Sequence, residues 1–580
     1  MTRAARRTSS PFFMSALTLV LVTAPLLFSA CSMARVAQDA PAPPPPAPES
    51  DASPSPGYHY SLAVLQNLSG QTDGAIRQME RAIKRDPKSA FLKTELAALY
   101  MDKGDSRKAI ALCEEALAEE PNAIDVHLLL GNIYLTIKDY QNAARVFRKT
   151  IEIEPKNVTA HLFLGTIYAE TKQYPSALEA FESLIRIDPD HVMGNFYHAR
   201  LLTEMKRYPE AERAFQKTLA LKPAFETALI ELAALYEKQK KTDAAAQLYR
   251  EFVQANPHRL NIKIKLVELL VRERQFPEAE KLLQEVLSSQ PRYRDARVSL
   301  GVLYYEKGEF QKAAEVFGAL TKDFPSDTRV RYLYASSLEE NKQPEKALEE
   351  YRRIPHEFDL YVNAQIHAGI LLKKMGRVPE AISNMQTALS LRRNAADLYL
   401  FLANLQDEEK NVAAAEETLQ RGIAAVPKNL ELHYALGVLF EKTNRFEESV
   451  RHMEIILKID PDHAEALNFI GYSYADRGLK LEEAERMIRR ALQLKPGSGH
   501  IIDSLGWVYF RQNKIDQAIK HLKEAHELLP NDPAVIEHLG DAYLKGGRPG
   551  DALELFRKAL KINPENGALQ KKINDLVKKK

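Results

Sequence analysis

Small and large apolar residues recur at fixed positions in a unit of 34 residues that covers most of the chain. Positions 7, 8 and 11 are typically Leu, a small residue and Tyr, and lie on one face of a first helix. Positions 20, 24 and 27 are typically Ala, Phe and Ala, and lie on one face of a second helix. Small residues let the two helices approach, and large ones fill the remaining gap. The third unit forms this pattern with Leu130, Gly131, Tyr134, Ala143, Phe147 and Pro155.

A proline at position 32 closes most units and ends their second helix. It recurs every 34 residues from Pro87 to Pro325 and returns in the later units up to Pro564. Only the step from Pro461 to Pro496 is longer, at 35 residues. Neither helix of a unit can bury its apolar stripe alone, so successive helix pairs should stack on one another.

The pattern therefore predicts an all-α protein of fifteen repeats over residues 56–566. A polar capping helix over residues 567–580 should shield the open end of the array. Pro355 falls inside the second helix of repeat nine and should cut that helix short. The extra residue of repeat thirteen should be absorbed by the turn between its two helices.

The unit resembles the tetratricopeptide repeat from about Pro56 to Pro564. This resemblance implies a right-handed superhelical solenoid of about fifteen 34-residue helix-turn-helix repeats, in which the first helices line a concave surface. It also implies that positions 2, 5, 9, 12 and 13 face a ligand. The segments ALNFIGYSYADRG, IIDSLGWVYF and IEHLGDAYLKGG are similar to the C-terminal end of large proteobacterial tetratricopeptide proteins. No repeat has lysine at position 5, so a chaperone-type carboxylate clamp is not expected.

We expect the main partner-binding groove in the last three repeats, where aromatic and polar residues are densest at the ligand-facing positions. Trp507 and Phe510 should be partly exposed anchors, and Trp507→Ala should then cost roughly 2 kcal/mol or more in affinity with little change in melting temperature. The alternative is that Trp507 and Tyr472 pack between neighbouring helix pairs. The main groove comprises Asn468, Tyr472, Asp476, Asp503, Trp507, Phe510, Arg511, Glu537, Asp541 and Lys545. A secondary groove comprises Asn132, Thr136, Phe196, Arg200 and Glu204, and Asn404 is a further ligand-facing residue.

The first 55 residues read as an export and anchoring segment. Residues 1–30 have a basic start and an apolar stretch, the layout of a signal peptide. The sequence LLFSACS resembles a lipoprotein signal, which implies that Cys31 is lipidated and becomes the new N-terminus. The alternative is an ordinary secretory signal cut after Ala34, which would release the protein unanchored. Residues 31–55 are rich in Pro, Ala and Ser and predict a disordered spacer.

The net charge and the residue composition argue against several classes of function. The formal net charge is +2, and removal of the three arginines of residues 1–30 would leave 2 − 3 = −1, so no nucleic-acid partner is expected. The only cysteines are Cys31 and Cys113, so no disulfide framework is expected. The histidines are scattered, without HExxH or Cys/His clustering, and we expect no metal and no cofactor. Fifteen repeats and a cap leave no stretch for a catalytic domain, so we expect no enzyme.

The leading hypothesis is a lipid-anchored, periplasm-facing scaffold that holds other proteins of a bacterial envelope or secretion assembly. Ser32 is similar to residues that direct such lipoproteins to the outer membrane. The first alternative is a periplasmic scaffold in exopolysaccharide export, which would favour aromatic platforms such as Tyr472 and Trp507. A cryptic enzyme is the third hypothesis, and the lack of a spare domain counts against it.

Overall fold

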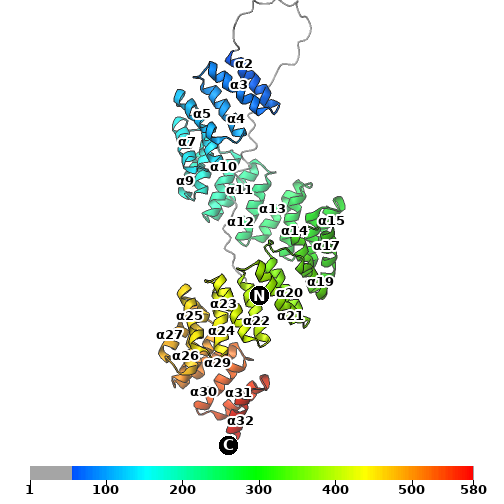
Figure 1. Cartoon of the computed structure of the whole chain (residues 1–580), viewed down its shortest axis with the longest axis vertical. Helices are drawn as coiled ribbons and strands as arrows, with labels where there is room; N and C mark the ends of the chain where they lie inside the picture. The colour runs from blue at the N-terminus through cyan, green and yellow to red at the C-terminus, as the bar shows by residue number, and fades with distance from the viewer. Residues whose placement is uncertain (1–54, 579–580) are drawn as a thin grey trace, which may run out of the picture. The chain divides into compact units, whose positions relative to one another are not determined.

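A computed structural model describes residues 55–578, and within this range every regular element is an α-helix. The helices form fifteen consecutive pairs followed by one final helix, as predicted (Figure 1). The first helices of the pairs are α2 (Pro56–Leu68), α4 (Ala90–Asp102), α6 (Ile124–Thr136), α8 (Val158–Glu170), α10 (Val192–Glu204), α12 (Glu226–Lys238), α14 (Leu260–Arg272), α16 (Arg294–Glu306), α18 (Thr328–Glu340), α20 (Tyr361–Lys374), α22 (Ala396–Glu408), α24 (Leu430–Lys442), α26 (Ala464–Arg477), α28 (Gly499–Arg511) and α30 (Pro533–Lys545).

The second helices follow after short turns. They are α3 (Thr72–Arg85), α5 (Ser106–Glu119), α7 (Tyr140–Ile153), α9 (Tyr174–Ile187), α11 (Tyr208–Leu221), α13 (Thr242–Ala255), α15 (Phe276–Ser289), α17 (Phe310–Asp323), α19 (Pro344–Arg352), α21 (Val378–Leu391), α23 (Val412–Ala425), α25 (Phe446–Ile459), α27 (Leu481–Leu494), α29 (Ile515–Leu528) and α31 (Pro549–Ile562). The final helix is α32 (Gly567–Lys578), which buries Leu569 and Ile573.

A small residue at position 8 of the first helix lets the second helix pack closely within most pairs. A Cβ atom added to Gly131 would lie 2.5 Å from Cζ of Phe147, whose side chain is completely buried. Any side chain at Gly131 would therefore push α6 and α7 apart. The same contact recurs between Gly165 and Phe181, between Gly301 and Phe317, and between Gly540 and Phe556.

A residue in the left-handed region ends most first helices and turns the chain toward the second helix. In repeat three Lys138 has a φ of 61°, and its N–H donates to the Leu135 carbonyl. The next N–H, of Asp139, donates to the Tyr134 carbonyl at 2.8 Å. These two bonds form a Schellman-type C-cap, a position that glycine usually fills. Among the described residues, ten non-glycine residues of these turns have a positive φ.

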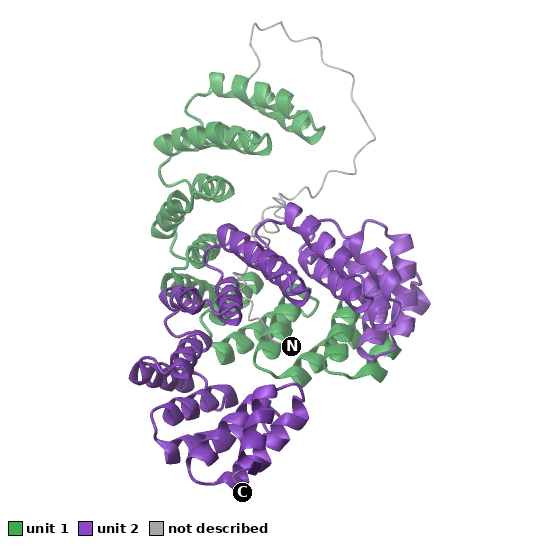
Figure 2. Cartoon of the chain, turned by 60° about the horizontal axis from the view of Figure 1, so that its bottom comes forward, with its two compact units in different colours: residues 1–282 green, residues 283–580 purple. Residues whose placement is uncertain are grey.

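The chain divides into two compact units, residues 1–282 and 283–580 (Figure 2). The core of the first unit includes a cluster of buried side chains from Ala63 to Ile167. The second unit contains a cluster from Ala314 to Phe440 and another from Val450 to Ile573. The secondary groove residues belong to the first unit, and the main groove residues belong to the second.

Repeat nine has a shortened second helix. Helix α19 ends at Arg352, before Pro355, as predicted. The last turn of α19 carries Tyr351, which is fully buried and donates its hydroxyl to Glu339 of α18 at 3.0 Å. Glu339 also bonds Nδ1 of His367 on α20 at 2.9 Å. These side-chain bonds tie three helices together where the short helix leaves less backbone to pack.

The extra residue of repeat thirteen lies in its turn, as predicted. Helix α26 has 14 residues where α24 has 13, and both Gly478 and Lys480 of the turn after it have a positive φ, so the extra residue is taken up around this turn without interrupting either helix.

The segments expected to direct export lie outside the described residues. These are the signal segment 1–30, Cys31 and nearly all of the spacer 31–55. Within residues 55–578, no helix combines the length and the apolar content that crossing a membrane would require.

Candidate partner-binding surface

The main predicted groove centres on a buried ion pair between neighbouring first helices. Nδ1 of His538 on α30 lies 2.9 and 3.1 Å from the two carboxylate oxygens of Asp503 on α28. Asp503 is 6% exposed and His538 is 9% exposed. Burial lowers the pKa of His538, but the adjacent Asp503 carboxylate outweighs it, so that the pKa is raised above its ordinary value. The Asp503 carboxylate therefore favours the protonated, cationic form of His538.

Trp507 packs beside this ion pair and is only 8% exposed. Its ring stacks on His538 with centroids 4.2 Å apart and on Phe510 with centroids 4.8 Å apart. Tyr472 of α26 also contacts the His538 ring, at 6.1 Å between centroids. The prediction that Trp507 is a partly exposed anchor is wrong, because His538 of the next repeat and Phe510 of its own helix cover the ring. The same burial removes Asp503 from the accessible surface.

The other residues of the main groove surround this buried centre. Lys572 of α32 pairs with Glu537 at 2.9 Å and with Asp541 at 2.7 Å, and Lys545 lies 4.7 Å from the Phe510 ring centroid. Several polar groups expected to orient a ligand thus hold neighbouring helices together. Six residues are half-buried and two are exposed: Asn468, Tyr472, Phe510, Arg511, Glu537 and Asp541 in the first group, Asp476 and Lys545 in the second.

The secondary groove is also partly closed. Phe196 is 2% exposed and packs against the ring of Phe225, with centroids 5.0 Å apart. Arg200 is 6% exposed, and its guanidinium pairs with Glu231 at 3.5 Å. The prediction that Phe196 and Arg200 face a ligand therefore does not match their burial. Asn132 is half-buried, and Thr136 and Glu204 are exposed, so these three remain accessible.

An accessible strip of side chains lies on four neighbouring first helices, α20, α22, α24 and α26, and sequence reasoning found only Asn404 and the two residues of α26. Position 9 of these helices forms one row and position 5 forms another. Asn404 is exposed and Val438 is 41% exposed, while the remaining members are half-buried. We call these eight residues the first-helix strip: Ile366, Leu400, Tyr434 and Asn468 at position 5, and Ile370, Asn404, Val438 and Tyr472 at position 9.

A row of ion pairs borders the first-helix strip at the C-terminal ends of the same helices. Lys373 of α20 bonds Glu408 of α22 at 2.8 Å. Asp407 of α22 pairs with Lys442 of α24, also at 2.8 Å. Glu441 of α24 pairs with Arg477 of α26 at 2.8 Å. Each pair links one first helix to the next, so the strip has a charged border and a largely apolar middle.

A polar residue at position 4 of four first helices holds its repeat to the one before it. Nε2 of His127, His161 and His433 lies 2.9, 3.0 and 3.1 Å from the backbone carbonyl of the proline six residues earlier. A carbonyl can only accept, so Nε2 donates in all three. Asn195 makes the same bond to the Pro189 carbonyl at 3.0 Å. Position 4 thus has a structural role, which the scattered appearance of these histidines in the sequence did not reveal.

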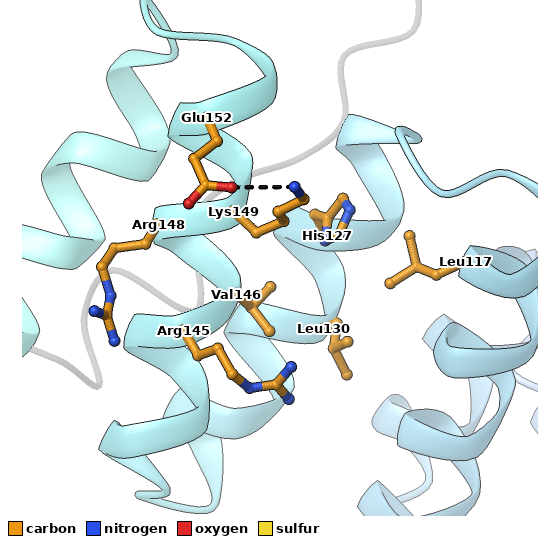
Figure 3. A pocket seen from close by; sticks show the side chains of 8 residues that line it. All are labelled: Leu117, His127, Leu130, Arg145, Val146, Arg148, Lys149 and Glu152. Carbon is orange, nitrogen blue, oxygen red and sulfur yellow. Dashed lines mark hydrogen bonds and ion pairs between the residues drawn. The ribbon is translucent and has the colours of Figure 1, made fainter.

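A small basic cavity lies on another part of the first unit. It measures about 340 Å³ and is bounded by α5, α6 and α7 (Figure 3). Leu117, Leu130 and Val146 supply apolar wall, and Lys149 pairs with Glu152 at 3.1 Å. None of the residues predicted to bind a partner lines this cavity.

No three His, Cys, Asp or Glu side chains among residues 55–578 gather as metal ligands would. Cys113 is fully buried, and burial raises the pKa of its thiol to about 12, so it stays protonated and packs as a small apolar side chain.

The Trp507 and His538 stack gives a direct optical readout of pH. Trp507 is the only tryptophan of the chain, and an imidazolium ring in contact with indole quenches its fluorescence. The raised pKa means that His538 binds its proton more tightly in the folded state, so its contribution to stability is present below pH 6.5 and lost as pH rises through the folded pKa. We expect Trp507 emission to increase as pH rises above 6.5 and His538 loses its proton.

His538→Gln is the control for this titration, since glutamine keeps a hydrogen-bond donor beside Asp503 but does not titrate. The variant should show no pH-dependent step in emission. A wild-type protein whose emission stays flat over the same range would contradict the assigned charge of His538.

Comparisons with known proteins place related sequences over most of the chain. The family model of the Cilia and flagella-associated protein 70 C-terminal domain matches residues 58–298. One tetratricopeptide repeat model matches residues 270–336, 304–368, 372–429 and 509–573, and a second matches residues 434–499. The TPR repeat-containing protein PA4667 of Pseudomonas aeruginosa is 34% identical over 178 residues, which span 30% of this chain and 30% of that protein.

Two solved structures are similar over long stretches at low sequence identity. A chain in the crystal structure of the APC/C hetero-tetramer Cut9-Hcn1 is 14% identical, with 83% of this chain and 95% of that chain covered and a TM-score of 0.35. A chain in the structure of Naa15/Naa10 bound to HypK-THB is 14% identical, with 90% and 96% covered and a TM-score of 0.32.

Proposed function

Since this chain is a tetratricopeptide repeat protein, we propose that it is an interaction scaffold of the bacterial cell envelope that holds another protein along the first-helix strip. The observation that carries the proposal is the composition of that strip. Four successive first helices present accessible apolar side chains together with the amide of Asn404, inside a border of ion pairs. Apolar contact area with a few polar groups that fix register is what recognition of a protein segment requires.

The strip is more suitable for this role than the buried centre around Trp507 and His538 in the last two repeats. Val438 and Asn404 can be reached by a partner without moving any side chain, whereas Trp507 and Asp503 are buried among their neighbours. A partner segment in extended conformation could place one side chain against each first helix it crosses. Polysaccharide binding, the alternative function, is less well supported. Trp507 is one of the two aromatic residues expected to stack on a sugar, and its ring is already stacked on His538.

We expect negative charges introduced on the first-helix strip to weaken the capture of the partner protein strongly. The double variant Asn404→Asp with Val438→Asp should lower recovery of the bound protein at least about 10-fold, because the new carboxylates lose hydration on binding. Affinity purification of the full-length chain from its own cells, followed by quantitative mass spectrometry, measures this. The matched control is Leu391→Asp on α21, where an equally exposed leucine lies on a second helix. If wild type, double variant and control recover the same proteins in the same amounts, the strip is not the binding surface.

A lipid anchor at Cys31 and an outer-membrane location facing the periplasm complete the proposal. The apolar stretch before LLFSACS and the Pro- and Ala-rich residues 31–55 support them. Cys31→Ala should turn a membrane-bound protein into a soluble or unprocessed one. Intact-mass analysis of the mature N-terminus checks this directly, and a chain that begins at Arg35 without acyl mass would contradict the anchor.

A further inference from the structure

The first helix of the array, α2, is uncharged and exposes large apolar side chains. Its sequence, PGYHYSLAVLQNL, contains no Asp, Glu, Lys or Arg. Tyr58 is 53% exposed, Leu65 is 62% exposed and Leu68 is 81% exposed. Exposed apolar area on an uncharged helix favours association, because burying it removes apolar surface from water.

The positions of Tyr58 and Leu65 show what kind of contact this face is built for. They are positions 3 and 10 of the first repeat, and in every later repeat both positions are buried. In repeat two they are Leu92 and Leu99, each 6% exposed, which belong to the same core cluster as Met79 of α3. The exposed stripe of α2 is therefore the stacking face of a repeat, which in repeat two is covered by the helix pair before it.

The apolar surface continues from the stacking face onto the adjoining side of α2. Leu68 is position 13, which in the fourteen later repeats is Asp, Glu, Thr, Lys or Arg. Val64 is 36% exposed and Phe91 of α4 is 56% exposed. We define the N-terminal patch as Tyr58, Val64, Leu65, Leu68 and Phe91. A polar residue at position 13 suits a solvated surface, so the leucine of repeat one indicates a surface that is covered.

We propose that the N-terminal patch joins two copies of this chain in a two-fold symmetric dimer, with α2 of one protomer packed on α2 of its partner. The second copy presents the same uncharged, apolar face, so the two faces can cover each other and leave water together. The absence of charges on α2 removes repulsion between identical surfaces that meet across a two-fold axis.

The opposite end of the array does not offer an equivalent surface. Helix α32 exposes Lys571, Asp575 and Lys578, so a head-to-tail contact would bury those charges against the apolar patch. Contact between two N-terminal patches avoids this cost. It also uses up both patches, so the assembly stops at a dimer. The dimer does not depend on which protein the first-helix strip holds.

Disulfide trapping in the full-length chain, in its own membranes, tests the dimer. Leu65→Cys places a thiol in the middle of the proposed interface, and mild oxidation with copper phenanthroline should yield a species of twice the monomer's mass on a non-reducing gel. Cys113 is completely buried, so it contributes no background. The matched control is Val577→Cys on α32, where a valine 49% exposed lies at the other end of the array and should give no such species.

A second variant confirms that the trapped species reflects the patch. Adding Leu68→Glu to Leu65→Cys should reduce the trapped fraction by about 10-fold or more, because each dimer would then bury two carboxylates. Leu68 is too exposed for this change to disturb the fold, which circular dichroism of the variant verifies. The proposal is overturned if Leu65→Cys gives no dimer, if Val577→Cys gives as much, or if Leu68→Glu leaves the fraction unchanged.

Discussion

His538→Ala should lower the free energy of unfolding of the last repeats by about 3–5 kcal/mol at neutral pH, because it leaves the Asp503 carboxylate buried without its partner. Asp503→Ala should cost less, about 1–3 kcal/mol, because histidine can release its proton close to neutral pH.

Urea unfolding of the full-length chain, followed by Trp507 emission, measures the free energy of unfolding of the last repeats in both variants. The double variant Asp503→Ala with His538→Ala provides the control, since it removes both members of the pair. It should be more stable than His538→Ala alone, because no charge is left unpaired. Equal losses for the two single variants would show that the ion pair is not the source of the effect.

Trp507→Ala should destabilise the last repeats by about 3–5 kcal/mol, because it removes a large buried ring from between Phe510 and His538. The sequence alone predicts the opposite pattern, a loss of partner affinity with little change in melting temperature. Because the Trp507 side chain is buried, we expect the loss of stability and not the loss of affinity. Thermal unfolding monitored by circular dichroism at the helical band gives the answer.

Phe510→Ala is a useful comparison for this substitution. Phe510 stacks on the other face of Trp507 but is half-buried, so its truncation should cost clearly less than truncation of Trp507. If Trp507→Ala leaves the melting temperature unchanged, the ring does not contribute to packing and the accessible surface must include it.

Contacts inside one repeat could be predicted from the sequence, because both partners recur at fixed spacing in every unit. Gly131 facing Phe147 is such a contact, and the early end of α19 follows from the backbone chemistry of Pro355 alone. The helix pairs, their turns and the place of the extra residue in repeat thirteen follow in the same way. Each depends on residues that are close together in the chain.

Exposure on the first helices could not be predicted in that way, because it depends on which side chains the adjacent repeats supply. Trp507 and Val438 both occupy position 9, yet Trp507 is 8% exposed and Val438 is 41% exposed. Trp507 is covered by His538, a residue of the next repeat that is not at a ligand-facing position. Likewise, the bond of His127 to the Pro121 carbonyl becomes recognisable as a rule only when His161 and His433 repeat it.

The left-handed turns between paired helices leave the array with a reserve of stability that it does not use. At ten of these turn residues an L-side chain, most often that of lysine, takes a backbone conformation that glycine would adopt without strain. Each exchange to glycine could release up to about 1 kcal/mol, and the turns are far enough apart for the gains to add. The melting temperature of this protein can therefore be raised in small independent steps. The residues to be changed belong to neither the first-helix strip nor the N-terminal patch.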